Sequence, residues 1–418
     1  MLVKLLCLAL LSIAAAGPLQ RRHGEQIRGV SDAGSIENVN IGGFLVLEAW
    51  ITPSIFDNTG NPDIVDEWTF GEYQDSDQAE AVINSHLDTF YTYSDFQDIK
   101  NAGLTHVRIP IGFWAFETLD TPYIKGNRYA KLQEVVGWCR DIGLKVWIDL
   151  HGAPGSQNGQ DNSGHLMDYF LWPTDQSNIE KSYYYIQILT DEFTKPEYGG
   201  IVDAIELMNE PQVAARPSMY DTVKTYFQNG YNIVSPKTAT AIAGGFIELD
   251  SWNDFLTYPG AENVYMDTHK YQIFSNQQIH QTDQQRLDSI CAFKQTFAEH
   301  TANQHWVICG EWTLAFTDCA KYINGRGNGS RYDGSQPGST AVGSCEGKSG
   351  NGDNWSEDYK NRLRYMWYTQ IDTFENGGRG YFFWTWKNED AADWSYKRLL
   401  ELGVISYDPN DYQHGICG

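Results

Sequence analysis

Near its midpoint the chain reads Ala204-Ile205-Glu206-Leu207-Met208-Asn209-Glu210-Pro211. The run 204–208 predicts a short buried strand, which ends before Pro211 because proline has no N–H to continue a ladder of hydrogen bonds. Glu210 is thereby placed at the carboxyl end of a strand. In a parallel α/β barrel the chemistry collects at this end, because the loops converge there over a rigid base.

A second glutamate occupies the same kind of position. Val307-Ile308-Cys309-Gly310-Glu311-Trp312 is again an apolar run that leads into an acid. Glu210 would follow the fourth strand of the chain and Glu311 the seventh, so the two side chains can face each other across the mouth of one barrel. Two carboxyl groups on two strand ends suggest a glycosidase, in which one protonates the leaving oxygen and the other supports or attacks the anomeric carbon.

Short apolar runs alternate with helical patterns along the chain, as expected of a parallel sheet covered by helices. Eight runs have strand character: 44–47, 106–110, 145–150, 204–208, 240–243, 264–268, 306–309 and 380–384. Helical periodicity is clearest in 132–142, 181–193, 219–233, 284–298 and 359–374. Gly103 and Gly143 are expected to cap two helices. We therefore expect one α/β domain, a (β/α)₈ barrel with elaborated rim loops, in which 26–39 adds an entry strand or hairpin at the bottom.

Composition limits the partners of this barrel. The formal net charge is −24, a surface that repels nucleic acid and anionic lipid and suits a neutral substrate. The 14 Trp and 25 Tyr would suit stacking on sugar rings, although most of them are expected in the core. We expect no nucleic-acid partner, no membrane partner, no cofactor and no metal, and a monomer.

The N-terminus predicts secretion. Residues 1–16 have the basic start, apolar middle and small-residue end of a signal peptide. Arg21-Arg22 resembles a dibasic processing site, so residues 17–22 are read as a propeptide and 23–418 as the mature catalytic domain. No other stretch reaches the roughly 18 apolar residues that a membrane span needs. Glycosylation sequons begin at Asn328 and Asn354, and the irregular segment 324–354 forms either a wall beside the site or a loop without a role.

Six cysteines remain after removal of the signal peptide, and their spacing alone does not choose among 15 pairings. Cys139 lies in a helical pattern and Cys309 in a strand, so both could be free core thiols. Cys291 with Cys417, and Cys319 with Cys345, are then the natural disulfides.

Two properties of the carboxyl pair follow from elementary chemistry. If Glu311 is ionised, its charge should raise the pKa of Glu210 and keep it protonated as the acid. A separation near 5 Å would indicate retention through a covalent intermediate, and about 6.5 Å or more would indicate inversion.

Further polar and aromatic side chains fall on the same rim. Taken singly, each has a structural alternative. The arginine could form an ion pair in the core, the histidines could be core side chains whose hydrogen bonds are satisfied, and the tryptophan could simply pack in the core. Their convergence on one end of the barrel favours a site, in which the cation holds Glu311 ionised and the indole supports a sugar face. They are Arg108, His151, His269, Tyr271 and Trp384.

Six motifs follow one another along the chain: Arg108-Ile109-Pro110-Ile111-Gly112, Asp149-Leu150-His151-Gly152-Ala153-Pro154-Gly155-Ser156-Gln157-Asn158-Gly159, Asn209-Glu210-Pro211, His269-Lys270-Tyr271-Gln272, Gly310-Glu311-Trp312 and Trp384-Thr385-Trp386-Lys387. In this order they resemble the fungal exo-β-1,3-glucanases, a branch of glycoside hydrolase family five. The similarity runs from about Gly29 to Cys417.

The resemblance implies a retaining barrel hydrolase that releases glucose from the non-reducing ends of β-1,3-glucan, with Glu210 as acid/base and Glu311 as nucleophile. Asn209 would hold the sugar 2-hydroxyl, Tyr271 would bond to the nucleophile, and Glu48 would close the pocket behind the terminal glucose. The resemblance supports the two disulfides above. The substrate-binding set is then Glu48, Arg108, His151, Asp161, Asn162, Asn209, His269, Tyr271, Phe274 and Trp384.

One position departs from the family pattern. After Ser156-Gln157-Asn158-Gly159 the family usually has an aromatic residue that clamps the next sugar, and this chain has Gln160. The opposing aromatic residue, Phe274, is present. Affinity on the acceptor side, chain-length preference and transglycosylation are the properties that this change would affect.

Three alternatives remain. A related barrel enzyme could act on β-1,6-glucan or on β-glucoside conjugates. A metal-dependent hydrolase could use His151, His165 and His269, although these lack a compact ligand spacing. A wall-glucan binding protein without turnover would not need both glutamates.

Overall fold

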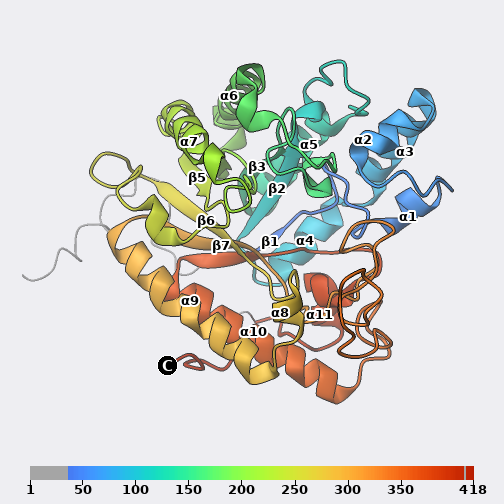
Figure 1. The fold of residues 1–418 in the computed structure, drawn as a ribbon. Coiled ribbons are helices and arrows are strands. Elements are labelled where there is room, and N and C mark those ends of the chain that lie inside the picture. Colours follow the sequence, from blue (N-terminus) through green and yellow to red (C-terminus); the bar gives the residue numbers. More distant parts are fainter. Residues whose placement is uncertain (1–35, 409–410) are drawn as a thin grey trace, which may run out of the picture.

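The computed structural model describes residues 36–408 and 411–418, which form a closed barrel of eight parallel strands in sequential order (Figure 1). The predicted signal peptide and propeptide lie outside the described residues. The strands are β1 (Ile36–Asn40), β2 (His106–Gly112), β3 (Lys145–Gly152), β4 (Val202–Glu206), β5 (Ala239–Ala243), β6 (Val264–Lys270), β7 (Trp306–Trp312) and β8 (Gly380–Phe383). The predicted (β/α)₈ fold is confirmed.

Seven of the eight predicted strands are confirmed, and the first is wrong. The barrel begins at β1, within the segment 26–39 that was expected to close the bottom; residues 26–35 lie outside the described part. The apolar run 44–47 is buried but irregular. Its backbone is satisfied by side chains, since Leu47 N–H donates to Glu67 Oε1 (2.7 Å) and Leu45 C=O accepts from Arg128 Nε (3.0 Å). A buried segment whose backbone is bonded to side chains therefore has the same apolar sequence pattern as a buried strand.

Helices surround the barrel (Figure 1). The five predicted helices correspond to α5 (Arg128–Ile142), α6 (Gln176–Phe193), α7 (Tyr220–Val234), α9 (Asp283–Asn303) and α10 (Glu357–Gly377). Shorter helices before β2 are α1 (Pro53–Asp57), α2 (Glu67–Glu72), α3 (Ser76–Thr89) and α4 (Tyr93–Asn101), and the others are α8 (Asn276–Ile279) and α11 (Tyr396–Glu401). Gly143 ends α5 with a left-handed φ of 80°, and Gly103 follows α4 with φ 84°, as expected of caps. Among the described helices none is both long and apolar enough to span a bilayer.

Two disulfides fix the periphery of the barrel. Cys291 on α9 is bonded to Cys417 near the C-terminus, and Cys319 to Cys345 in the loop after β7. Cys139 and Cys309 are free and buried. Both predicted pairs are confirmed.

Candidate active site

Glu210 stands just beyond β4, at the carboxyl end of the barrel. The strand ends at Glu206, earlier than expected, but the chain stays against its neighbour because Asn209 N–H donates to Leu150 C=O on β3 (3.0 Å). Glu210 itself has a left-handed φ of 42°, which is unusual for a residue with a side chain and occurs where the surroundings enforce it. Its side chain is buried, with 7% exposed.

Glu311 lies within β7 and is paired in register with His269 on β6. The preceding residue has to be glycine, because a Cβ on Gly310 would stand 2.1 Å from the Asp267 carboxylate. Without that Cβ, Gly310 N–H donates to Asp267 Oδ1 at 2.7 Å. The sheet register and this close approach fix the direction of Glu311.

The two glutamates meet, as predicted. One carboxylate oxygen of each lies within 4.8 Å of the other, and both lie within that distance of a ring nitrogen of His269. Retaining glycosidases have carboxyl groups about 5 to 5.5 Å apart, whereas inverting enzymes need about 6.5 to 9.5 Å to admit a water. The observed spacing belongs to the retaining class.

Glu311 is held by two donors on opposite oxygens. Arg108 Nη1 donates to Oε1 (2.9 Å), and the Tyr271 hydroxyl donates to Oε2 (2.7 Å). Burial raises the pKa of Glu311, while the positive charges of His269 and Arg108 act in the opposite direction. The carboxylate is therefore fixed in orientation, with Arg108 on one oxygen and His269 Nδ1 3.4 Å from the other.

Arg108 is the centre of a polar cluster beneath the site. Its guanidinium is fully buried and its Nε donates to Glu206 Oε2 (2.7 Å). Asp149, also buried, lies 3.1 Å from Nη2. The remaining donors are used by Asn40 Oδ1 (3.0 Å) and Asn209 Oδ1 (2.9 Å).

Sequence reasoning missed part of this cluster, namely Asn40, Glu206 and Asp267. A polar residue inside an otherwise apolar strand was the available signal, for example Glu206 between Ile205 and Leu207. Burial raises the pKa of Glu206 well above its usual range; Arg108 opposes this effect, and the carboxylates of Asp149 and Asp267 add to it. Burial and the two neighbouring carboxylates therefore favour the protonated form of Glu206.

Glu210 is bonded on both oxygens. His269 Nδ1 lies 2.7 Å from Oε1, and Asn162 Nδ2 donates to Oε2 (2.8 Å). Burial acts to raise the pKa of Glu210, but the hydrogen bond and positive charge of His269 outweigh it and hold the pKa below its ordinary value. The expected elevation is therefore wrong, because the sequence argument included the charge of Glu311 but not the nearer cation. The His269 pKa is raised well above its ordinary value. Burial lowers this pKa, but the negative charges of Glu311 and Asp267 raise it by more than burial lowers it.

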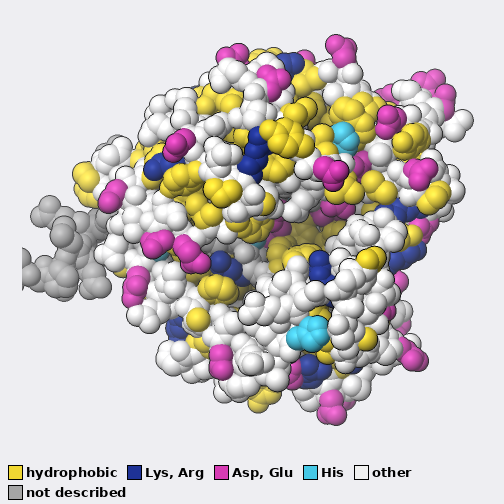
Figure 2. Space-filling model, in the orientation of Figure 1, with side chains coloured by type: hydrophobic (Ala, Val, Ile, Leu, Met, Phe, Trp, Pro, Cys, Tyr) yellow, Lys and Arg dark blue, Asp and Glu magenta, His cyan; other side chains and the backbone are white. Residues whose placement is uncertain are grey.

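The glutamates open into a cavity of about 520 Å³. Figure 2 shows it as a hollow near the middle of the face, with acidic and hydrophobic side chains visible inside. The predicted residues in its wall are Glu48, Asp161, Asn162, Tyr271, Phe274 and Trp384. Residues that the sequence analysis did not identify are Trp50, Leu166, Gln212, Phe246, Ile323, Asn324, Gly325, Arg331 and Trp394; Gln160 also lies in the wall.

The cavity has a buried end and an exposed end. Trp50 and Trp394 are at most 6% exposed, whereas Phe246, Phe274 and Leu166 are 43–50% exposed. Trp50 Nε1 donates to Glu48 Oε2 (2.9 Å), and burial, followed by the charge of Asp161, raises the pKa of Glu48 well above its usual range. Burial and the nearby Asp66 raise the pKa of Asp161 to about 6.

Two predicted residues lie behind the cavity wall. His151 is stacked against Trp384, with ring centroids 5.6 Å apart and planes at 7°, and its Nδ1 lies 2.6 Å from Asp149 Oδ2. Asn209 is fully buried, and its Nδ2 lies 3.5 Å from His151 Nε2. In this structure both support the site from behind, and a contact of Asn209 with a sugar hydroxyl stays a prediction.

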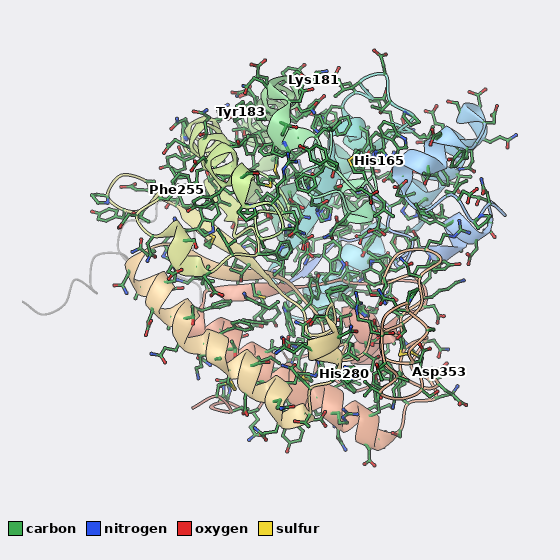
Figure 3. All side chains as sticks on the ribbon, in the orientation of Figure 1. His165, Lys181, Tyr183, Phe255, His280 and Asp353 are labelled. Atoms are coloured by element: carbon green, nitrogen blue, oxygen red, sulfur yellow. A yellow bond between two sulfur atoms is a disulfide. The ribbon has the colours of Figure 1, made fainter. Side chains whose placement is uncertain are left out.

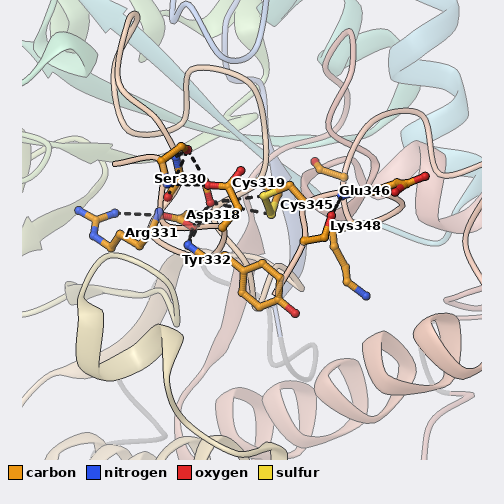
Figure 4. The surroundings of a disulfide bond; sticks show 12 residues. Asp318, Cys319, Ser330, Arg331, Tyr332, Cys345, Glu346 and Lys348 are labelled. Carbon is orange, nitrogen blue, oxygen red and sulfur yellow. Dashed lines mark hydrogen bonds and ion pairs between the residues drawn. A yellow bond between two sulfur atoms is a disulfide. The ribbon is translucent and has the colours of Figure 1, made fainter. Parts of the chain in front are cut away.

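The loop after β7 forms one wall of the cavity, which confirms the first of its two readings. Buried Asp318 anchors it: one oxygen accepts from Ser330 Oγ (2.7 Å) and from Tyr332 N–H (2.9 Å), and the other accepts from Arg331 N–H (2.8 Å) (Figure 4). The Cys319–Cys345 disulfide lies beside this anchor. The sequon residue Asn328 is exposed and lies in the cavity wall, and Asn354 is exposed before α10.

The three histidines considered for a metal do not gather. Figure 3 shows His165 beside α2, where its ring is stacked on Trp68 with centroids 4.1 Å apart. In the described part of the chain, the clusters of ligand-type atoms contain His269 but neither His151 nor His165. A site built from those three histidines is excluded by geometry.

Comparison with known proteins agrees with this architecture. The family model of cellulase (glycosyl hydrolase family 5) matches residues 57–325. A glucan 1,3-beta-glucosidase from Yarrowia lipolytica is 39% identical, with 99% of this chain and 98% of that protein covered. Another from Lachancea kluyveri is 39% identical over 92% and 89% of the two chains. A solved rutinosidase structure from Aspergillus niger has the same fold, with a TM-score of 0.69, 19% identity, and 89% and 98% of the two chains covered. The chain therefore belongs to glycosyl hydrolase family 5, and within that family it groups with the glucan 1,3-beta-glucosidases.

Proposed function

We propose that this chain is a secreted exo-acting β-1,3-glucosidase that releases glucose from the non-reducing ends of β-1,3-glucan, with Glu311 as nucleophile and Glu210 as acid/base. The observation that carries the proposal is the distance of at most 4.8 Å between one oxygen of each carboxylate. At that spacing no water fits between Glu311 and the anomeric carbon, so the carboxylate itself attacks.

In the first step Glu311 forms a bond to the anomeric carbon while the glycosidic oxygen leaves with a proton from Glu210. Arg108 and Tyr271 direct Glu311 through hydrogen bonds of 2.9 and 2.7 Å, which leaves little freedom to turn away from the sugar. As the carboxylate becomes an ester its charge disappears, and these donors then bind it less strongly, which favours release in the second step.

The proton belongs to the pair of His269 and Glu210. The histidine lies 2.7 Å from the carboxylate, and its raised pKa keeps one proton on the pair near neutral pH. Transfer across this hydrogen bond gives the neutral acid that the leaving group needs. In the second step Glu210 accepts a proton from the attacking water, and the pair returns to its initial state.

The shape of the cavity favours exo action. Its buried end, near Glu48, Trp50 and Trp384, has room for a chain terminus, and its exposed end, near Phe246 and Phe274, would pass the rest of the chain to solvent. A sugar can enter the acceptor side in place of water, so transglycosylation belongs to the proposal. Gln160, in place of a clamping aromatic residue, would weaken the retention of that acceptor.

Secretion, removal of residues 1–22 and glycosylation at Asn328 and Asn354 complete the proposal. They are supported by the apolar N-terminal segment, the Arg21-Arg22 pair and the exposure of both asparagines. Intact mass and N-terminal sequencing of the secreted protein test them: a start at His23 and glycan mass at either asparagine are expected.

The decisive experiment is proton NMR of the first sugar released from laminarin. We expect β-glucose before mutarotation, with glucose as the sole early product. Initial release of the α-anomer would overturn retention, and internal oligomers would overturn exo action. Faster turnover of gentiobiose than of laminaribiose would favour the alternative, a related enzyme for β-1,6-glucan.

A further inference from the structure

A second cavity, of about 300 Å³, opens beside the active site, and the mechanism above places no part of the substrate in it. It lies between the segment after β5, the end of β6 and α9, and we call it the side cavity. Its walls include Glu210 and Phe246, which also line the active-site cavity. The other lining residues that matter here are Glu248, Lys270, Phe293 and Thr296. A ligand in the side cavity would therefore adjoin the acid/base.

Lys270 gives the side cavity its polar character. Its ammonium lies 4.4 Å from the centroid of the Phe293 ring, and among the described residues it has neither a hydrogen bond nor an ion pair. Lys270 is partly buried, and burial lowers the pKa of its ammonium. Such a group gains from any ligand that brings hydroxyl oxygens.

The lining matches a neutral polyol better than an ion. The wall carries both signs of charge, with Lys270 and His269 on one side and the carboxyl groups of Glu210, Glu248 and Asp267 on the other, and not the single sign expected of an ion site. Phe246 and Phe293 offer aromatic rings of the kind that pack on the C–H face of a pyranose. The volume is at the lower end of small-ligand sites, about 300 to 1,000 Å³, and therefore suits one sugar unit rather than a chain.

We propose that the side cavity is a subsite for one neutral glucosyl residue on the leaving-group side of the scissile bond. This inference rests on the proposed function, because it takes Glu210 as the acid that faces the leaving group. The residue would be either the next unit of a linear chain or a branch carried on the first leaving-group sugar; the chemistry of recognition is the same. This subsite would supply part of the acceptor binding that the family places on the aromatic residue replaced by Gln160.

The test blocks the side cavity from outside the core. Thr296 is an exposed residue of α9 in its wall, so Thr296→Trp fills the cavity without changing a buried position. Ala298→Trp is the matched control, since Ala298 is exposed on the same helix and lies outside both cavity walls. Lys270→Met removes the ammonium and keeps most of the apolar stem. Thermal unfolding shows whether each variant is folded.

The readout is the ratio of kcat/KM on a sugar substrate to kcat/KM on an aryl β-glucoside, whose leaving group has no sugar. We expect Thr296→Trp and Lys270→Met to lower this ratio about fivefold, the loss expected of one or two hydrogen bonds, mainly through KM. Ala298→Trp should leave it unchanged. A loss with linear laminaritriose assigns the cavity to the main chain, and a loss confined to a 6-O-branched oligosaccharide assigns it to the branch.

An unchanged ratio on both sugar substrates in folded Thr296→Trp and Lys270→Met would overturn the subsite. So would an equal loss on the aryl glucoside, because that would indicate damage to Glu210 rather than a lost sugar contact. Failure of the proposed function is seen separately, in wild-type protein that leaves laminaritriose intact.

Discussion

Arg108 Nη1 donates a hydrogen bond of 2.9 Å to Glu311 Oε1, and the guanidinium is fully buried. The positive charge opposes the effect of burial, which raises the pKa of Glu311. A nucleophile has to be ionised, so this contact, together with the larger effect of His269, lowers the pH at which the enzyme loses activity on acidification.

Arg108→Met should therefore shift the acid limb of the kcat/KM profile to higher pH. Removal of the cation raises the Glu311 pKa further, and a carboxyl with a higher pKa needs a higher pH to ionise. Tyr271→Phe should shift the limb in the same direction, because the hydroxyl donates to the other oxygen of Glu311 at 2.7 Å. The measurement is a pH series with an aryl β-glucoside.

Arg140→Met is the control for that series, since Arg140 is on the surface of α5 and contacts Asp141 and the Glu197 carbonyl, neither of which lines the active-site cavity. Tyr271→Phe keeps the test valid if Arg108→Met does not fold. An acid limb at the wild-type position in a folded variant of either residue would contradict the assignment of Glu311 as nucleophile.

Glu210→Ala should separate substrates by their leaving groups. On β-1,3-glucan, kcat should fall by about 10² to 10⁴, the usual contribution of a general acid. Glycosides with activated leaving groups need less protonation and should lose much less in the glycosylation step. Glu311→Ala should remove almost all turnover of both kinds, and similar losses of both substrates in Glu210→Ala would argue against its role as acid.

The barrel was predictable because short apolar runs alternate with helical patterns along the whole chain, so the prediction did not depend on any single residue. The first strand was not, since β1 contains Glu37, Asn38 and Asn40, whereas the run 44–47 is wholly apolar and is buried against the Glu67–Arg128 pair instead. Sequence shows that a segment is buried, but it does not show what satisfies the backbone of that segment.

The same limit applies to the site. Motifs located Glu210 and Glu311, but the Glu210 pKa depends on His269, whose contact arises only when β6 and the end of β4 are brought together. Glu206 and Asp267 were missed because their partners come from other strands. The side cavity likewise depends on α9 covering β6, a relationship absent from the local sequence.

Glu206 offers a test of the buried charge cluster. Its raised pKa indicates a neutral acid that accepts from Arg108 Nε at 2.7 Å, and glutamine has nearly the same shape and no charge. Glu206→Gln should therefore change the free energy of unfolding by less than about 1 kcal/mol. Glu206→Ala leaves Arg108 Nε without that acceptor and should cost about 1 to 3 kcal/mol. Denaturant titration measures both, and a large loss in the glutamine variant would show that the carboxylate is ionised.

The two disulfides should separate stability from substrate binding. Cys291–Cys417 closes a loop of 126 residues, and neither cysteine lies in the wall of the active-site cavity. Cys319–Cys345 closes 26 residues within the segment that forms part of this wall. Loop-closure entropy predicts losses of about 5 and about 3.5 kcal/mol for the paired Cys→Ser variants. Loss of Cys291–Cys417 should therefore lower the denaturant midpoint more than loss of Cys319–Cys345, and it should leave KM for laminarin unchanged. Loss of the shorter one should raise KM, because Asp318 then holds Arg331 and Tyr332 without its covalent neighbour. Equal KM values in the two variants would mean that the Asp318 hydrogen bonds alone are enough to hold the wall in place.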